Sequence, residues 1–388
     1  MKRRTFLAST AAALACRPDA GDQTDTGLPP VTLPSSDPCA DDVAVGTLVR
    51  EQKFLDEPER ELENLSGVGL DGRQVLDLTT LSAAELVVPQ ERLFVRTAQP
   101  PGLEGNNWEV TVGGLIEAPV TLSIEAILAQ TQDMGIVHFE CSGNTNFGGF
   151  GLQGAVAFSG VPFAWVLDQI APLPEATAIL VSGFDDHPPP TGNSTPGASW
   201  VFRPEQLQDA FLATHINGEP LTPDHGWPVR LMVPGWYGCV CIKWLDRITW
   251  VDDDEPATSQ MLEFASRTNQ DGAPPLARDF APANVDVAAV PIRVEVWDVE
   301  GTERSRVVGL VWGGEVLPEG LRLWADDVDV GLVEVCPDRE SPRTWALWHA
   351  LLPESVSGRT DLTLTVDDPG VVTRRLDEGY YLRTVRIP

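Results

Sequence analysis

The part of the chain after about residue 265 consists of short runs in which apolar and polar residues alternate, and this pattern restricts the fold more than any other feature. VPIRVEVWDVEG, SRVVGLVWGG, LRLWADD and DLTLTVDD are examples. Gly, Asp and Pro separate the runs, and hardly any stretch has a helical period. Such spacing is typical of antiparallel sheets that pack face to face. We therefore predict an all-β sandwich over residues 265–388.

Residues 46–260 mix helix and strand patterns. From Trp108, the segment WEVTVGGLIEAPVTLSIEAIL alternates through a hairpin and then enters a short helix that Ser123 would cap. MGIVHFEC and ATAILVSGFDD are typical of strands, whereas VPFAWVLDQIA and RPEQLQDAFLA have the period of helices. The sequence therefore predicts an α+β domain before the sandwich.

The first 15 residues, MKRRTFLASTAAALA, have the features of an export signal. A basic start precedes an apolar stretch that is too short to span a bilayer, and small residues follow. Arg3 and Arg4 resemble the twin-arginine signal, which directs folded proteins across a membrane. We expect a periplasmic or cell-envelope protein, which either is released by cleavage after Ala15 or carries a lipid anchor on Cys16.

Residues 16–45 are rich in Pro, Asp, Thr and Ser and contain few large apolar side chains. Such a segment cannot repay the entropy lost on ordering, so we expect a disordered linker there.

Acidic side chains outnumber basic ones by 57 to 27, which gives the chain a net charge of −30. A surface this acidic repels phosphate backbones, so the composition excludes a nucleic-acid-binding function. It is compatible with a basic protein partner, and equally with charge that serves only to keep the surface solvated.

The six cysteines are scattered through the chain and do not form the dense framework of a small disulfide-rich scaffold. Export would permit disulfides between some of them. On a strand, Cys239 and Cys241 would point to the same face. A zinc site is not favoured, because no second close pair or histidine cluster accompanies them.

Three segments contain residues that could carry chemistry. FECSGNTNFGG places Cys141 between a buried strand and a glycine-rich loop, where the sulfur could face a ligand. DHGWPVRLMVPGWYGCVCIKWLDRITW contains His225, Arg230 and Lys243, three potential cations on a rigid loop that would suit a phosphate. RLFVRTAQPP contains Arg96. Taken singly, each has a structural alternative: core packing for the cysteine and ion pairs for the cations.

In this order, FVRTAQPP, WEVTVGGLIEAPVTLSIEAI, FECSGN and INGEPLTPDHGWPVRLMVPGWYGCVCIKWLDRI resemble the molybdopterin-binding domain of the sulfite oxidase family, over roughly residues 85–255. VVGLVWGG and RTWALW resemble the immunoglobulin-like dimerisation domain that follows it in this family. The resemblance implies a homodimeric oxidoreductase with a molybdenum–molybdopterin cofactor, one molybdenum per chain, and two-electron oxygen-atom transfer as its chemistry.

The resemblance also assigns roles to residues. The Cys141 thiolate would bind molybdenum, since a soft sulfur ligand suits such a centre, and Arg96 would orient the substrate. Asp185 would contact the pterin, with Asp186 as the alternative. The other expected cofactor contacts are Phe94, Val95, Arg96, Thr97, Ala98, His225, Arg230, Cys241, Ile242 and Lys243. Within this set, the three potential cations would neutralise the buried cofactor phosphate, and residues 241–243 would form a strand that closes the phosphate pocket.

The chain departs from the family pattern at positions that matter for the substrate. Thr145, Asn146 and Phe147 stand where sulfite oxidases have arginines just after the cysteine motif, and Pro196 stands where they have a tyrosine. Ala98 replaces a histidine. Arg96 is the one plainly retained member of the oxyanion-binding cluster, so we expect a small oxygen-bearing or anionic substrate other than sulfite.

No C-x-x-C-H motif for haem attachment occurs in the chain. Electrons would therefore pass to or from a separate carrier, such as a basic cytochrome that docks on the acidic surface. Two alternatives remain at this point. The same site could reduce sulfoxides or other oxygen donors, or the chain could be a cofactor-free extracellular binding module.

Overall fold

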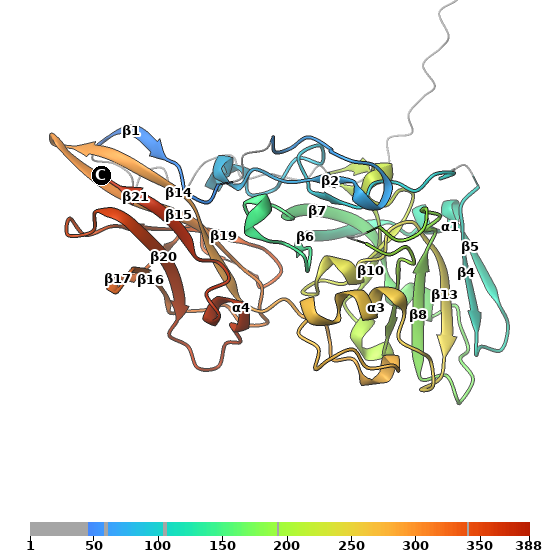
Figure 1. The fold of residues 1–388 in the computed structure, drawn as a ribbon. Helices are drawn as coiled ribbons and strands as arrows, with labels where there is room; N and C mark the ends of the chain where they lie inside the picture. Colours follow the sequence, from blue (N-terminus) through green and yellow to red (C-terminus); the bar gives the residue numbers. More distant parts are fainter. Residues whose placement is uncertain (1–45, 58–60, 104–106, 192–193, 340) are drawn as a thin grey trace, which may run out of the picture.

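The computed structural model describes residues 46–388 except 58–60, 104–106, 192–193 and 340. The predicted export signal and linker therefore lie outside the described residues. The described chain forms two parts that lie side by side (Figure 1). None of the helices in this part of the chain is long and apolar enough to cross a membrane.

The first part contains two larger sheets and a small one. One sheet consists of β11 (Glu219–Pro220), β10 (Phe211–Ile216), β7 (Gln153–Pro162) and β6 (Gln132–Glu140), in this order, with β12 (Arg230–Met232) also paired to β10. The other has the order β5 (Val120–Ser123), β4 (Glu109–Gly114), β13 (Leu245–Val251), β8 (Ala178–Gly183) and β9 (Ser199–Phe202). The small sheet pairs β2 (Arg73–Gln74) with β3 (Val95–Arg96).

The α-helices described in the first part are short, so this α+β domain consists mainly of strands. They are α1 (Ile124–Leu128), α2 (Phe163–Leu167) and α3 (Ser259–Phe264). The predicted cap of α1 is confirmed, because the Ser123 hydroxyl accepts a hydrogen bond of 3.2 Å from the backbone N–H of Ala126.

The helix predicted for RPEQLQDAFLA is wrong. Only Pro204–Leu207 forms a 3-10 turn, and the apolar residues that follow begin β10. All six residues of β10 are buried, because this strand lies between β7 on one side and β11 and β12 on the other. A short, fully buried apolar run has the same appearance in a helix and in a central strand, so the period alone could not decide.

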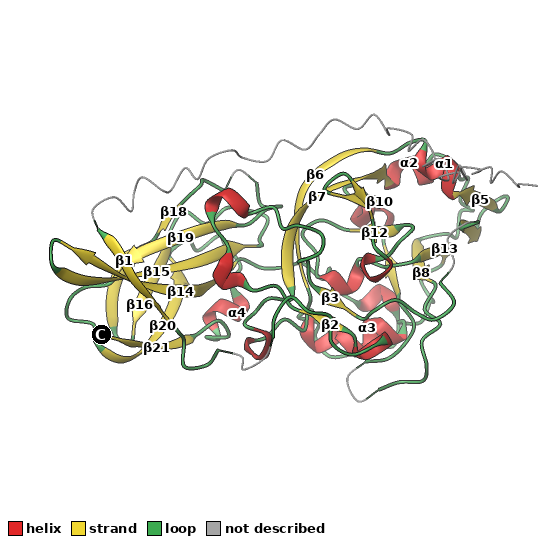
Figure 2. Ribbon diagram, turned by 90° about the horizontal axis from the view of Figure 1, so that it is seen from above, coloured by secondary structure: helices red, strands yellow, loops and turns green. Residues whose placement is uncertain are grey.

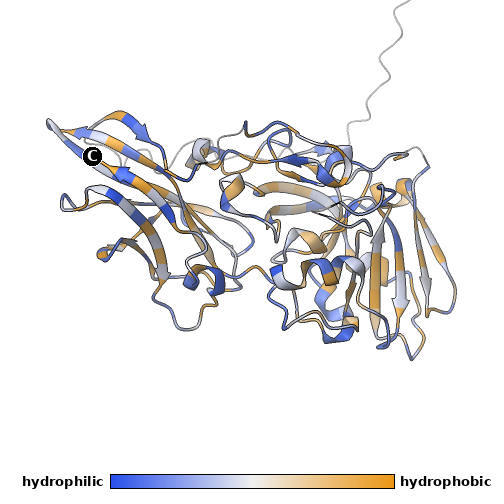
Figure 3. Cartoon of the chain, viewed as in Figure 1, coloured by the Kyte–Doolittle hydropathy of each residue, from blue (hydrophilic) through white to orange (hydrophobic). Residues whose placement is uncertain are grey.

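The second part consists of two sheets in separate layers, as the alternating runs predicted (Figure 1). One sheet has the order β1 (Thr47–Gln52), β14 (Ala288–Val299), β15 (Thr302–Trp312), β19 (Ala346–Leu351) and β18 (Glu334–Val335). The other has the order β17 (Val328–Leu332), β16 (Leu321–Ala325), β20 (Gly358–Val366) and β21 (Arg383–Ile387), and α4 (Arg374–Asp377) lies between its last two strands in the chain. Hydrophobic and hydrophilic residues alternate along these strands (Figure 3).

Strand β1 belongs to the second part, whereas the prediction placed residues 46–260 in the first part. It pairs antiparallel with β14, from Thr47 opposite Asp298 to Gln52 opposite Val294. The first described strand therefore completes the sandwich formed by the last third of the chain.

The two parts share one hydrophobic core and meet along β6 and the loops around it (Figure 2). The backbone N–H of His138 donates to the carbonyl of Arg343 at 2.6 Å, and the indole N–H of Trp345 donates to the carbonyl of Leu86 at 2.8 Å. The strand that leads to Cys141 is thus held by the sandwich.

Candidate functional site

Cys141 directly follows β6 and begins the glycine-rich loop. Its side chain is 4% exposed and forms no disulfide. Its backbone N–H donates to the carbonyl of Leu152 at 2.9 Å, and the N–H of Gly143 donates to its Sγ at 3.4 Å. The sulfur is therefore fixed at the end of a sheet strand, with a backbone N–H pointing toward it.

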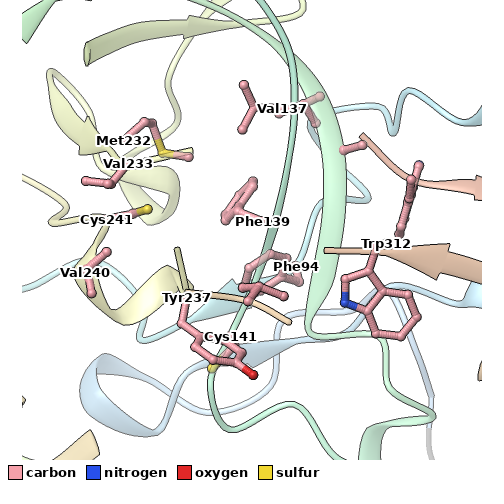
Figure 4. Packing of buried hydrophobic residues seen from close by; sticks show 14 of the residues in the cluster. Phe94, Val137, Phe139, Cys141, Met232, Val233, Tyr237, Val240, Cys241 and Trp312 are labelled. Carbon is pink, nitrogen blue, oxygen red and sulfur yellow. The ribbon is translucent and has the colours of Figure 1, made fainter. Parts of the chain in front are cut away.

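A pocket of about 100 Å³ lies beside this sulfur. It is lined by eleven of the predicted site residues, namely Phe94, Val95, Arg96, Thr97, Cys141, Asp185, His225, Arg230, Cys241, Ile242 and Lys243. Figure 4 shows Cys241 with its sulfur toward Phe139, and Cys141 beside Tyr237. Segments far apart in the sequence thus meet at one sulfur.

Two predicted contacts lie elsewhere. Ala98 is not among the residues that line the pocket, and its carbonyl accepts a hydrogen bond of 3.0 Å from Nε2 of His187. Asp186, the alternative to Asp185, is exposed and lies outside the pocket.

The strand expected over residues 241–243 is also wrong. Gly238–Val240 form a 3-10 turn, and the chain then runs as a loop until β13 begins at Leu245. The Pro and Gly residues in VPGWYG favour turns, and the loop lets the side chains of Cys241 and Lys243 reach the pocket.

Arg230 is a buried cation in this pocket. Burial lowers its pKa to about 10, so the guanidinium remains charged at neutral pH. Nη1 donates to the carbonyl of His225 at 3.0 Å, and Nη2 donates to the carbonyl of Cys241 at 3.1 Å. Its Nε is buried and has no hydrogen-bond partner among the described residues. A buried charged donor without an acceptor is costly, so this N–H fits an anionic ligand.

Lys243 lies across the same pocket. Its Nζ donates to the carbonyls of Arg96, Thr97 and Asp224, at 3.2 Å for the first and 2.8 Å for the last. Burial, together with the nearby Arg230 charge, holds the pKa of Lys243 well below its usual range. Three neutral carbonyls are weak partners for a buried ammonium, so an anion in this pocket would stabilise its charged form.

His225 supports the pocket as a neutral ring. Burial lowers its pKa to about 3, and the charges of Lys243 and Arg230 add to the effect. Its Nδ1 is 2.7 Å from the Thr222 hydroxyl, and Nε2 is 3.3 Å from the carbonyl of Leu93, which can only accept. Both ring nitrogens therefore bind neighbouring segments of the chain and fix them around Arg230 and Lys243.

Asp185 holds the wall of the pocket. Its carboxylate accepts hydrogen bonds from His187 and from the backbone N–H groups of Gly197 and Ala198. Burial alone would raise the pKa of Asp185, but these hydrogen bonds outweigh burial and lower it.

An open cleft of about 690 Å³ borders the loop that follows Cys141. Four arginines line it, namely Arg73, Arg96, Arg267 and Arg375. The sequence interpretation missed three of them, because single arginines in β2, after α3 and in α4 show no motif. Only the pairing of distant segments brings them together.

The sandwich supplies Arg375 and Tyr380 to this cleft and fixes the Cys141 loop. Nη2 of Arg375 donates to the carbonyl of Ser142 at 3.0 Å and to that of Arg267 at 2.8 Å. The Tyr380 hydroxyl donates to the carbonyl of Asn144 at 2.6 Å. The site therefore depends on both parts of the chain.

Glu140, the residue before Cys141, joins the two parts. Its fully buried carboxylate accepts hydrogen bonds from Trp312 Nε1 at 2.8 Å and Asn144 Nδ2 at 3.1 Å. Trp312 comes from the sandwich and lies across β6 from Phe139 (Figure 4). Burial raises the pKa of Glu140, while Arg375 and these hydrogen bonds oppose the rise.

Comparisons with known proteins bear on what this site binds. Residues 97–259 match the family described as "Oxidoreductase molybdopterin binding domain". The chain is 28% identical to the mitochondrial sulfite oxidase of Drosophila melanogaster over 72% of this chain and 53% of that protein. It is 31% identical to the NADPH nitrate reductase of Emericella nidulans over 45% of this chain and 22% of that protein. The chain thus spans about a fifth of that nitrate reductase and about half of that sulfite oxidase.

Among solved structures, the sulfane dehydrogenase SoxCD from Paracoccus pantotrophus is similar, with a TM-score of 0.60 and 18% identity. The match covers 81% of this chain and 80% of that one, and it therefore includes much of the sandwich as well as the first part. At this identity the likeness shows a common fold.

Proposed function

We propose that the pocket beside Cys141 holds the molybdenum–molybdopterin cofactor and that Cys141 is the protein ligand of the metal, because residues 97–259 match the molybdopterin-binding oxidoreductase domain and the chain is similar to a sulfite oxidase. The observation that carries the proposal is the position of the Cys141 sulfur in one pocket with Arg230 and Lys243. A soft thiolate and a phosphate-binding pair of cations are the two features that such a cofactor needs from a protein.

The donor set fits this cofactor. The unpaired Nε of Arg230 and the carbonyl-bound ammonium of Lys243 suit a buried phosphate. Within the described residues, no group of three or more His, Cys, Asp or Glu side chains could hold a metal ion. Cys141 would supply one ligand, and the bound pterin dithiolene would supply the other sulfur atoms.

The pocket measures about 100 Å³, whereas ligand pockets usually measure about 300–1,000 Å³, so we infer that the side chains around it move when the cofactor enters. Lys243 spans the gap between the segment from Arg96 to Thr97 and the turn at Asp224. We infer that its ammonium exchanges these carbonyls for the cofactor phosphate, which opens the pocket.

When bound, the cofactor supplies two-electron oxygen-atom transfer. The chain's own residues bind and orient the reactants. Arg96 lines both the pocket and the open cleft, and its Nη1 donates to the carbonyl of Leu70 and the Thr97 hydroxyl, each at 3.0 Å. Burial lowers the pKa of Arg96, but the nearby Cys141 opposes this and favours the charged form. Arg96 would thus present a fixed cation to a small oxygen-bearing or anionic substrate.

Electrons would pass to or from a separate carrier. The net charge of −30 supports a basic cytochrome as the partner. Turnover with such a cytochrome should fall as ionic strength rises from about 10 to 200 mM, because salt screens the attraction. A rate that does not change with salt would exclude electrostatic docking.

We propose that the protein is exported by the twin-arginine route. Cys336 is disulfide-bonded, which supports an oxidising compartment. Replacing Arg3 and Arg4 by lysines should leave folded, cofactor-containing protein in the cytoplasm. Export of the doubly substituted protein at the normal level would contradict this route. Mass spectrometry of the exported form would show whether Cys16 carries a lipid.

We also propose an immunoglobulin-like sandwich that pairs two chains, on the basis of the two-layered sheets. Sedimentation of the purified protein should give the mass of a dimer. A monomer at micromolar concentration would contradict it.

The cofactor assignment is tested by the composition of protein purified from a molybdenum-replete host. We expect one molybdenum and one pterin per chain. Folded protein that contains neither would overturn the assignment and favour a cofactor-free binding module.

A further inference from the structure

The strongest feature that the proposed function leaves unexplained is the group of arginines in the open cleft. In an acidic chain, Arg73 and Arg267 form no ion pair with any described carboxylate. Arg73 Nη1 donates instead to the carbonyls of Leu70 and Gly72, each at 2.8 Å. Arg267 packs over the ring of Phe264, with the guanidinium carbon 5.4 Å from the ring centre. Both cations are available to an anion that enters the cleft.

Arg73 also faces a like charge. In the small sheet, Arg73 lies directly opposite Arg96, and like charges at opposed positions destabilise a strand pair. Burial, together with the charge of Arg96, lowers the pKa of Arg73 to about 10. A sheet of two-residue strands gains little stability from its own hydrogen bonds. An anion between these guanidinium groups would therefore stabilise the sheet by offsetting the repulsion between the two charges.

Arg267 and the sulfur both lie near Gly143. A Cβ on Gly143 would lie 3.4 Å from Nη1 of Arg267 and 3.8 Å from Sγ of Cys141. The glycine thus leaves the approach between the guanidinium and the sulfur open. The carbonyl of Arg267 is held by Arg375, so the turn that carries this cation is fixed to the sandwich.

The cleft is larger than a simple oxyanion needs. A water occupies about 30 Å³ of liquid, so an ion of four or five heavy atoms fills on the order of 100 Å³, against about 690 Å³ here. The remaining space borders aromatic side chains. Phe147 is 78% exposed and Tyr380 is 36% exposed, and both line the cleft.

We propose that Arg73 and Arg267, together with Arg96, bind the oxyanion group of an organic substrate whose apolar body lies against Phe147 and Tyr380. This inference rests on the proposed function for the identity of the reacting centre. The sequence predicted a small substrate, because the arginines that follow the cysteine motif in sulfite oxidases are missing. The structure supplies two arginines from other segments in their place, and the aromatic side chain of Phe147 in the loop would favour a larger molecule.

The test uses purified holoenzyme and three unreactive probes in titration calorimetry at low ionic strength. Benzenesulfonate has both the charge and the ring, methanesulfonate has only the charge, and methyl phenyl sulfone has nearly the same shape without the charge. Benzenesulfonate should bind at least about tenfold more tightly than either of the others, a difference of one decade in Kd. If methanesulfonate bound as tightly as benzenesulfonate, the proposed contact with the apolar body would be wrong. If the sulfone bound as tightly, the proposed recognition of the charge would be wrong.

Variants assign the binding to residues. Arg73→Gln and Arg267→Gln should each weaken benzenesulfonate binding by about tenfold or more, and Phe147→Ser should weaken the binding of benzenesulfonate but not that of methanesulfonate. Arg359→Gln, on an exposed position of β20, is the matched control and should bind as the wild type does. Unchanged binding in both cleft variants would overturn the proposal. Arg267 is exposed, so its variant should fold even if the Arg73 variant does not.

Molybdenum content separates this inference from the proposed function. If all variants contain molybdenum and none differs in benzenesulfonate affinity, the inference fails and the cofactor assignment stands. If wild-type protein contains no molybdenum but binds benzenesulfonate through these arginines, the cofactor assignment fails and the anion site stands.

Discussion

Replacing Glu140 by alanine tests whether the carboxylate beside Cys141 holds the two parts of the chain together. The substitution leaves Trp312 Nε1 and Asn144 Nδ2 buried without their acceptor. Each unsatisfied donor costs about 1–3 kcal/mol. Arg375 also loses a carboxylate that lies 4.0 Å away. The total should be about 3–5 kcal/mol, the usual cost of removing one partner from a buried charged network.

Urea unfolding and thermal unfolding measure this loss. For domains of this size, about 1 kcal/mol lowers Tm by roughly 2–4 °C, so Glu140→Ala should unfold at least about 6 °C earlier. Glu140→Gln keeps the volume and one acceptor oxygen, so it should lose less. The control is Glu109→Ala, an exposed position in β4 that should change stability by less than about 0.5 kcal/mol. A Glu140→Ala protein within about 1 kcal/mol of the wild type would refute the structural role of this carboxylate.

Three further predictions follow from the site and its surroundings. Gly226→Ala should destabilise the protein by about 1–3 kcal/mol, because φ is +105° and the new Cβ would lie 3.1 Å from the Cβ atoms of Arg230 and Lys243; Gly235→Ala has φ of +82° and open space, so it should cost less in the same urea titration. Burial lowers the pKa of His138 to about 3, so the folded protein binds fewer protons than the unfolded chain between about pH 6.5 and 3, and stability falls as pH falls through this range. His138→Gln should reduce that slope by up to about 1.4 kcal/mol per pH unit, and an unchanged slope in urea titrations at pH 6.5 and 5 would contradict the assignment. Lys243→Gln should lower the pterin content of purified protein, whereas a normal content would show that its ammonium does not hold the phosphate.

Local patterns were enough to predict much of the fold. Alternation and turn residues predicted the sandwich, and the apolar run before Cys141 predicted β6. The Ser123 cap was predictable for the same reason, because a cap depends on residues within one turn of it.

What the sequence could not predict depends on contacts between distant segments. β1 joins β14 across most of the chain, and no local signal marks this pairing. The same holds for Arg73 and Arg267, which approach Cys141 only because the small sheet and the turn after α3 meet at its loop. The residues next to Cys141 in the sequence therefore predict less positive charge beside the sulfur than the structure has.

The claim at the centre of this account is that the Cys141 sulfur binds molybdenum. X-ray absorption at the molybdenum edge counts the sulfur atoms bound to the metal in purified protein. We predict one fewer sulfur ligand in Cys141→Ser than in the wild type, and no change in Cys239→Ser, whose thiol lines the same pocket. Identical sulfur shells in the wild type and Cys141→Ser would contradict the account.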